Sequence, residues 1–240
     1  MSSVPYISVV VPVYNEQDNI EPLTRELAGV LAEVNRPYEI IFVDDGSTDE
    51  SPKKMQEAQG QFPGIRVVRF KRNCGQTAAF DAGFRAARGE VVITMDADLQ
   101  NDPHDIPPML ALIGPYDLVC GWRHRRNDDI VRRLSSRIAN RIRNRLSGEN
   151  IQDVGCSLKV FRREYAQRLK LFTGMHRFFP TLVKFEGGRV VEVKVNHRPR
   201  KFGTAKYGLG NRMMRSFLDL LAVCWMKRRY LRYEIEDQKP

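Results

Sequence analysis

The chain has 240 residues, of which 42% are apolar and 28% are charged, so it is long enough to fold around a substantial core. This composition excludes low-complexity, collagen-like and strongly disordered chains, and it predicts one α/β domain with a short appendage. No apolar stretch approaches the length needed to cross a bilayer. The four cysteines show no CxxC pair and no zinc spacing, which excludes a disulfide or zinc scaffold.

The net charge of +10 is unevenly divided along the chain. Residues 1–120 contain 10 Lys and Arg against 18 Asp and Glu, whereas residues 121–240 contain 29 against 11. An acidic half suits metal ions or hydroxyl-rich ligands, and a basic half suits phosphate, nucleic acid or an anionic membrane surface. The sequence begins without a basic leader or a small-residue cleavage site, so we expect a cytoplasmic protein.

The first half alternates short runs rich in Val and Ile with stretches of helical periodicity. Such an alternation predicts a parallel sheet covered on both faces, with right-handed crossovers. The predicted strands are 7–11, 39–43, 65–70 and 91–95, and the predicted helices are about 20–34, 51–59 and 76–87. In the second half we expect strands at 117–121, 157–161 and 189–195, an Arg-rich helix, a segment at 176–185 and a terminal helix at about 209–233.

A polar cluster follows each of the first four predicted strands: PVYNE, DDGSTD, KRNCGQ and DADLQND. The carboxyl ends of parallel strands meet at one edge of the sheet, and ligands of open α/β sheets bind at that edge. The alternative is that these clusters are ordinary turns and helix caps, with Asp49 or Ser51 capping the second helix. Four clusters at the same edge favour a ligand site.

The segment MDADLQ contains two carboxylates at a spacing that has a geometric meaning. If the backbone is extended there, the side chains of Asp96, Asp98 and Gln100 project to the same side. Such an oxygen-rich set suits Mg²⁺ or Mn²⁺, which would bridge the protein to a diphosphate. Phosphatases with an Asp-x-Asp nucleophile are the competing interpretation, but their pair follows the first strand. The chain has neither a G-x-G-x-x-G motif nor a P-loop, so carboxylates and backbone must hold any nucleotide.

The motifs VVVPVYNE, VDDGSTDES, Asn73 to Gly75 and MDADLQNDP, in this order, resemble the family 2 glycosyltransferases of GT-A fold. The later motifs GWR, DVGCSLKVFRR and HRPRKFGTAKYG are similar to the branch that contains dolichol-phosphate mannose synthase and the bacterial polyprenyl-phosphate glycosyltransferases. The resemblance covers about residues 5–225. It implies a Rossmann-like, mostly parallel sheet flanked by helices, with a catalytic domain at 1–208 and an amphipathic C-terminal helix and tail at 209–240. Within that domain, the donor half is about 1–120 and the acceptor half about 121–208.

The resemblance also implies roles for individual residues. The nucleoside of a GDP- or UDP-sugar donor would be enclosed by Pro12, Tyr14, Glu16, Asp44 and Asp45. Asp96 would lie beside the donor sugar and diphosphate, and with Asp98 and Gln100 it would form the site of a Mg²⁺ or Mn²⁺ ion. The implied enzyme is a hexosyltransferase of the dolichyl-phosphate mannosyltransferase type. Which sugar it carries, and whether the base is uracil or guanine, stays open.

The acceptor implied by the resemblance is a polyprenyl phosphate, held by Arg123, Arg132, Ser136, Arg200 and Lys206. Asp153 would border this acceptor site as a catalytic residue, or else serve as a cap or salt-bridge partner. The family loop usually has Ser or Thr just before the lysine, where this chain has Ala205. A phosphate monoester is largely a dianion at neutral pH, so it needs cations rather than a strong general base. We expect a single displacement with inversion at the anomeric carbon.

Two basic amphipathic segments point to a membrane surface. Apolar residues recur at helical spacing from Val131 to Leu146, and nine Arg and no Lys lie in residues 121–147. The terminal helix repeats the pattern with Phe217, Trp225 and the basic cluster 227–229. We therefore expect a peripheral enzyme on the cytoplasmic face of an anionic membrane, alone or docked on a separate integral membrane protein. The alternative is that the first apolar stripe packs on the sheet.

Two other functions are compatible with parts of the sequence. A nucleic-acid-binding module would explain the basic charge, but it has no use for DADLQ or DDGSTD, and the Arg-rich segment lacks stacking aromatics. The closer alternative is a family 2 enzyme that glycosylates a hydroxyl of a saccharide or cell-envelope polymer. Such an enzyme needs a general base, whereas the arginines favour a phosphate acceptor.

Overall fold

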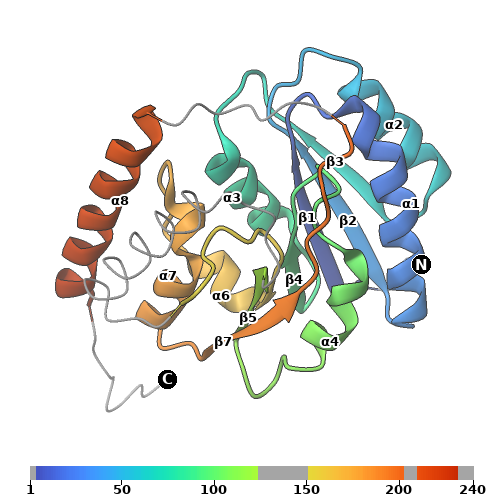
Figure 1. Cartoon of the computed structure of the whole chain (residues 1–240). Coiled ribbons are helices and arrows are strands. Elements are labelled where there is room, and N and C mark those ends of the chain that lie inside the picture. The colour runs from blue at the N-terminus through green and yellow to red at the C-terminus, as the bar shows by residue number, and fades with distance from the viewer. Residues whose placement is uncertain (1–3, 124–150, 203–209, 232–240) are drawn as a thin grey trace, which may run out of the picture.

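A seven-stranded sheet forms the centre of the computed structural model, which describes residues 4–123, 151–202 and 210–231, with side chains from 218 onward in the last range (Figure 1). The strand order is β3-β2-β1-β4-β6-β5-β7. The strands are β1 (Ile7–Val13), β2 (Tyr38–Asp44), β3 (Ile65–Arg69), β4 (Val91–Thr94), β5 (Leu118–Arg123), β6 (Lys159–Arg162) and β7 (Val190–Val195). All neighbouring pairs are parallel except those of β6, which runs antiparallel to both β4 and β5. The predicted mostly parallel α/β sheet is confirmed.

Helices cover both faces of the sheet, because its central strands are apolar on both sides. One face packs against α1 (Gln17–Glu33), α2 (Ser51–Gln61) and the short η1–α4 segment (Pro103–Asp105 and Ile106–Leu110). The other face packs against α3 (Gln76–Ala86), α6 (Arg163–Arg168), η2 (Met175–Phe178), α7 (Phe179–Phe185) and α8 (Gly210–Arg229). Alternation along β1 shows the cause, since Val9 and Val11 belong to the first core and Val10 to the second.

The strands of the predicted donor half and acceptor half belong to one continuous sheet, since β4 pairs with β6 and β6 with β5. The predicted Arg-rich helix around 131–146 lies outside the described residues. The predicted terminal helix is present as α8. No helix in the described part of the chain is long and apolar enough to span a bilayer.

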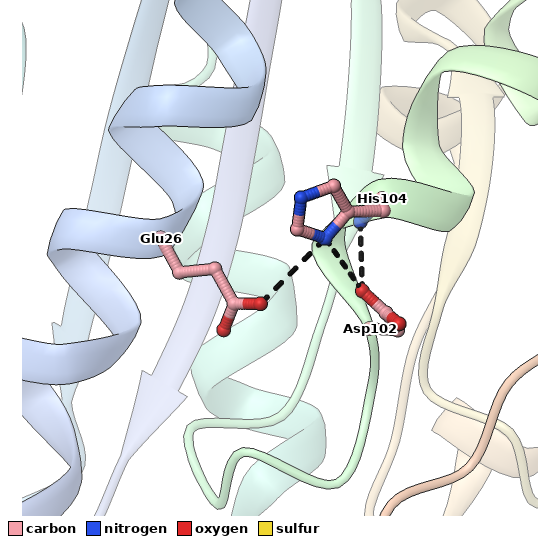
Figure 2. Close-up of side chains that lie close together, drawn as sticks. All are labelled: Glu26, Asp102 and His104. Carbon is pink, nitrogen blue, oxygen red and sulfur yellow. Dashed lines mark hydrogen bonds and ion pairs between the residues drawn. The ribbon is translucent and has the colours of Figure 1, made fainter.

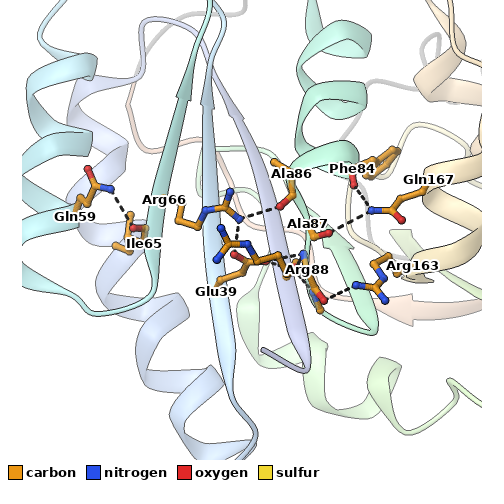
Figure 3. Close-up of polar contacts among 12 residues, drawn as sticks. Glu39, Gln59, Ile65, Arg66, Phe84, Ala86, Ala87, Arg88, Arg163 and Gln167 are labelled. Atoms are coloured by element: carbon orange, nitrogen blue, oxygen red, sulfur yellow. Dashed lines mark hydrogen bonds and ion pairs between the residues drawn. The ribbon is translucent and has the colours of Figure 1, made fainter. Parts of the chain in front are cut away.

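The edge of the sheet at the amino ends of the strands is closed by structural polar contacts (Figure 3). Arg66 donates to Glu39 and to the carbonyl of Ala86, and Gln167 donates to the carbonyls of Phe84 and Ala87. These side chains satisfy carbonyl groups that the end of α3 leaves unpaired. Burial disfavours the charge of Glu39, but its hydrogen bonds outweigh that effect and lower its pKa. The charged groups of this edge therefore hold the fold together.

Helix α3 approaches β1 so closely that only glycine fits at Gly83, where an added Cβ would lie 2.1 Å from Cγ1 of Val10. We expect Gly83→Ala to lower the free energy of unfolding by about 1–3 kcal/mol, because the core must shift to accept the methyl group. In the matched control, Gly29→Ala in α1, the new Cβ meets nothing within 4 Å. It should raise stability by up to about 1 kcal/mol through helix propensity. Urea unfolding measures both changes, and equal effects would contradict the close packing of α3 on β1.

Candidate functional site

The polar loops that follow β1, β2 and β4 meet at one edge of the sheet, because these three strands are neighbours and parallel. Val13 and Asp44 end their strands as register partners, and the Asp45 amide donates to the Val13 carbonyl at 2.8 Å. The Met95 amide continues this contact after β4 by donating to Val10 at 3.2 Å. The predicted convergence of the loops is therefore observed.

The loop after β1 is tied to the loop after β2 by hydrogen bonds. The backbone amides of Asn15 and Glu16 donate to the hydroxyls of Ser47 and Ser51 at 3.0 and 2.8 Å. Asp49 accepts from the amide of Gln17, which starts α1. The alternative that Asp49 or Ser51 simply caps the second helix does not describe these contacts, because the N-cap of α2 is Glu50, without a side-chain cap bond. Asp49 accepts from the Ser51 amide at 2.9 Å through Oδ1 and from the Gln17 amide through Oδ2. Pro12, Tyr14 and Glu16 are all half-buried at this edge.

Asp44 and Asp45 hold neighbouring loops through buried carboxylates. The Asp44 carboxylate accepts from the Ser47 amide at 2.8 Å and lies 3.1 Å from Nε of Arg69. The Asp45 carboxylate accepts from the amides of Cys74 and Gly75, at 2.6 and 2.9 Å, and from Asn73 Nδ2 at 2.9 Å. Burial raises the pKa of Asp45, although the hydrogen bonds from the Cys74 and Gly75 amides oppose this rise. The two carboxylates therefore hold the loops after β2 and β3 in place.

Asp96 and Asp98 lie close together but have different partners. Gln76 Nε2 donates to Asp96 Oδ1 at 2.7 Å, and burial, followed by the nearby charge of Asp98, raises the pKa of Asp96 to about 6. Asp98 Oδ2 accepts from Nη2 of Arg200 at 2.6 Å. The expected extended backbone is not seen, since β4 ends at Thr94 and Leu99 has a φ of 61°. A tight turn therefore brings the two carboxylates together.

Arg200 joins the two halves of the chain, because its guanidinium also lies 3.8 Å from Oε1 of Glu16. The segment that carries it is fixed to the loop after β4. The Arg198 amide donates to the Gln100 carbonyl at 2.9 Å, and Gln100 Nε2 donates to the Arg198 carbonyl at 3.4 Å. The side-chain amide of Gln100 is thus used in holding this segment.

Arg123 and Asp153 form a buried, bidentate ion pair with N–O distances of 2.7 and 2.9 Å. Burial alone would lower the pKa of Arg123, but the bonds and charge of Asp153 raise it above its ordinary value. The salt-bridge interpretation of Asp153 is observed directly. The pair engages Nε and Nη2 of Arg123. Arg132, Ser136, Ala205 and Lys206 lie outside the described residues.

Sequence reasoning did not single out three residues that contact this site. Gln76 bonds to Asp96, the Ser157 hydroxyl accepts from the Asp96 amide at 3.2 Å, and Lys159 is buried in β6 behind them. Gln76 lies in one of the four polar clusters, so its place in the sequence could have indicated a site residue. The sequence around Ser157 and Lys159 does not indicate a site, because only the antiparallel pairing of β6 brings them next to β4.

A second group of possible metal ligands, Glu26, Asp102 and His104, lies beside the site (Figure 2). Arg198 already neutralises it, since its Nη2 lies 2.7 Å from Glu26 and 2.6 Å from Asp102. Burial opposes ionisation of Asp102, but bonds from His104 and Arg198 outweigh it and lower the pKa. Glu26 and Arg198 also line a cleft of about 620 Å³ between α1 and residues 198–202. This cleft contains neither Asp96 nor Asp98.

The raised pKa of Asp96 predicts a pH-dependent stability. The value of about 6 in the folded chain exceeds that of an unfolded aspartate, about 3.9, so the folded state holds more protons between these pH values. The free energy of unfolding therefore falls as pH rises from about 4 to about 6. In the absence of divalent ions, Asp96→Asn should be more stable than the wild type at pH 7.5, by about 1–3 kcal/mol.

The measurement is thermal unfolding of both proteins at pH 4 and pH 7.5, where the gain from Asp96→Asn should shrink at the lower pH. Asp98→Asn is the matched control, because it removes the charge that Arg200 faces at 2.6 Å and should not stabilise the protein. Equal stability of wild type and Asp96→Asn at both pH values would contradict a destabilised Asp96 carboxylate in the folded chain.

The chain is similar to known proteins in sequence and in fold. Residues 8–170 match the family described as Glycosyl transferase family 2. Over 228 residues the chain is 40% identical to a dodecaprenyl-phosphate galacturonate synthase from Rhizobium johnstonii, covering 92% of this chain and 67% of that protein. Over 210 residues it is 39% identical to an undecaprenyl-phosphate 4-deoxy-4-formamido-L-arabinose transferase from Edwardsiella ictaluri, covering 86% and 64%. The chain thus spans about two thirds of the length of these relatives.

Solved structures with low identity share the fold. A glucosyl-3-phosphoglycerate synthase from Mycobacterium tuberculosis, in complex with Mn²⁺, UDP and phosphoglyceric acid, has a TM-score of 0.71 at 18% identity, covering 93% of this chain and 78% of that one. A mannosyltransferase from Pyrobaculum calidifontis, in complex with GDP-mannose and Mn²⁺, has a TM-score of 0.61 at 21% identity, covering 97% and 66%. The expected GT-A-like fold is confirmed, and the chain belongs to glycosyl transferase family 2.

Proposed function

We propose that this chain transfers a sugar from a nucleotide-sugar donor to a polyprenyl phosphate, with inversion at the anomeric carbon. The observation that carries the proposal is the charge arrangement of the site: Arg200 Nη2 donates to Asp98 at 2.6 Å, and the charge of Arg123 acts on Asp96. A reaction between two phosphorylated molecules needs cations on both sides of the reacting carbon. The names of the relatives at about 40% identity support the same acceptor class.

A divalent metal ion fits the donor set of the site. Asp96, Asp98 and Gln100 offer only oxygen ligands and amide groups, and the guanidinium of Arg200 already stands as a cation against Asp98. In the proposal, these three residues would hold Mg²⁺ or Mn²⁺, which would supply positive charge to the diphosphate of the leaving nucleotide. The complexes of the structural neighbours contain Mn²⁺. Arg200, which now pairs with Asp98, would then be available to bind a phosphate.

Different residues of the chain bind the donor and the acceptor in this proposal. Pro12, Tyr14 and Glu16 line the nucleoside side, and the buried Asp44 and Asp45 hold the loops that enclose it. Arg123, together with Arg200, holds the acceptor phosphate. Arg132, Ser136 and Lys206 complete this acceptor site in the proposal and lie outside the described residues.

The step itself is a single displacement. An oxygen of the acceptor phosphate forms the new bond to the anomeric carbon while the bond from that carbon to the nucleoside diphosphate breaks, and the electron pair leaves with the diphosphate. No proton must be removed, because the acceptor is largely a dianion at neutral pH. Asp153 positions Arg123 in this scheme through its bidentate pair. Transfer to a saccharide hydroxyl is the second candidate, but it needs a base, and Asp153 is occupied by Arg123.

The donor sugar in the proposal is a hexose, as in dolichyl-phosphate mannosyltransferases. The decisive assay combines the purified protein, Mg²⁺ or Mn²⁺, a polyprenyl phosphate and a panel of UDP- and GDP-sugars, including a uronic acid and a pentose. We expect a monoglycosylated lipid phosphate by mass spectrometry. Asp98→Ala and chelation should each reduce product by at least about 100-fold, because the diphosphate loses its counter-ion.

Normal turnover of Asp98→Ala or of the chelated enzyme would contradict the metal assignment. A glycosylated saccharide, or free sugar, as the only product would contradict the phosphate acceptor. Asp105→Asn serves as a matched control, because Asp105 follows the same strand but bonds to Asn196 rather than to the site. Its activity should stay close to that of the wild type.

We also propose that α8 docks on an anionic membrane on the cytoplasmic side. Its inner face is buried through Leu220 and Val223, whereas Leu218, Leu221 and Trp225 are 56%, 45% and 64% exposed. The exposed basic residues 227–229 follow directly. An apolar helix face with an interfacial Trp and flanking cations suits the headgroup region of a bilayer.

The double substitution Leu221→Ala with Trp225→Ala should weaken binding to vesicles containing phosphatidylglycerol by about tenfold or more, because it removes most of the exposed apolar surface. Co-sedimentation with vesicles measures this. Phe172→Ala is the matched control, since Phe172 is 43% exposed outside α8. Unchanged vesicle binding by the double variant would contradict docking through α8, and no vesicle binding by the wild type would favour docking on a separate integral membrane protein instead.

A further inference from the structure

A lysine is buried behind the site without an obvious ion-pair partner. Lys159 opens β6 and is only 2% exposed. Its register partners on the neighbouring strands are Thr94 of β4 and Cys120 of β5. In the described residues no carboxylate lies within ion-pair distance of its ammonium group, which donates to the backbone carbonyl of Cys156. Burying a cation costs free energy of folding, so we expect Lys159 to have a role that an apolar side chain could not fill.

The carbonyl that Lys159 contacts belongs to the loop of residues 153–157, which touches the site at both ends. At one end, Asp153 holds the guanidinium of Arg123 through two hydrogen bonds. At the other end, the Ser157 hydroxyl accepts from the Asp96 amide at 3.2 Å and donates to Asn101 Oδ1 at 2.7 Å. The loop therefore holds Arg123 through Asp153 and the backbone of Asp96 through Ser157.

Lys159 is placed to hold this loop against β4. The Ser157 carbonyl accepts from the Thr94 hydroxyl at 2.6 Å, one residue from the carbonyl that Lys159 binds. Two consecutive carbonyls of the loop are thus held by donors from the sheet. The Lys159 charge also acts on Asp96, whose pKa it lowers against the larger effects of burial and Asp98. Gly155 adds a steric requirement, since a Cβ there would lie 2.9 Å from Nη2 of Arg123.

We propose that Lys159 is a positioning residue: by binding the Cys156 carbonyl it keeps the 153–157 loop in place, so that Arg123 and Asp96 stay correctly placed on opposite sides of the reacting groups. The inference rests on the proposed function, because it assigns these two residues to the acceptor phosphate and the donor. Its physical basis is that groups which orient ligand-binding side chains affect activity without touching the substrate.

The test compares Lys159→Met, which keeps the length of the side chain but loses the charge and the donor, with Lys159→Arg, which keeps both. We expect Lys159→Met to retain or increase its melting temperature, because replacing a buried charge by an apolar group of similar size is often stabilising. Its kcat should fall about 10–100-fold. Lys159→Arg should recover most of that loss. Lys184→Met, a half-buried lysine of α7, is the matched control and should have the kcat of the wild type.

A kcat of Lys159→Met equal to that of the wild type would overturn the proposal. So would a loss of activity that follows a loss of stability, or failure of Lys159→Met to fold, because the lysine would then serve the fold alone. If the wild type gives no glycosylated lipid phosphate, the proposed function fails separately. The crystal structure of Lys159→Met then tests the inference: the Ser157–Asp96 hydrogen bond should be lost, and an unmoved loop would contradict it.

Discussion

The ion pair between Arg200 and Asp98, 2.6 Å apart, connects the acidic first half of the chain with its basic second half. Burial, followed by the charge of Asp98, raises the pKa of Asp96, and cations from later in the chain oppose this cost. Arg200 reaches Asp98 from the segment after β7, and Arg123 arrives at the end of β5. The opposite charges of the two halves thus meet at this site, where the proposed reaction between two anionic substrates needs cations.

The sheet makes this meeting possible. Because β1 lies between β2 and β4, the loops after these strands converge, and each is fixed by hydrogen bonds to its neighbour. Strand β6 then enters antiparallel between β4 and β5, so the loop that precedes it reaches the same edge of the sheet. That placement brings Asp153 and Ser157 to the site from one loop. Rigid strands therefore carry the functional loops, while the helices on both faces supply the core.

Much of this arrangement could be predicted from local sequence. Runs such as Val9 to Val11 give strands because β-branched residues pack well on both faces of a parallel sheet, and the polar clusters after them mark its carboxyl edge. The partners of individual side chains could not be predicted. Asp45 binds the amides of a loop almost 30 residues away, and Lys159 sits behind Asp96 only because β6 is inserted next to β4. Such contacts depend on which loops the whole fold brings together.

The most direct test of the account is a crystal structure of the protein with Mn²⁺ and the nucleoside diphosphate of its donor. We expect Asp98 to hold the ion and the guanidinium of Arg200 to have moved from Asp98 to a phosphate oxygen. An ion bound instead at Glu26, Asp102 and His104, with the Arg200–Asp98 pair intact, would contradict it.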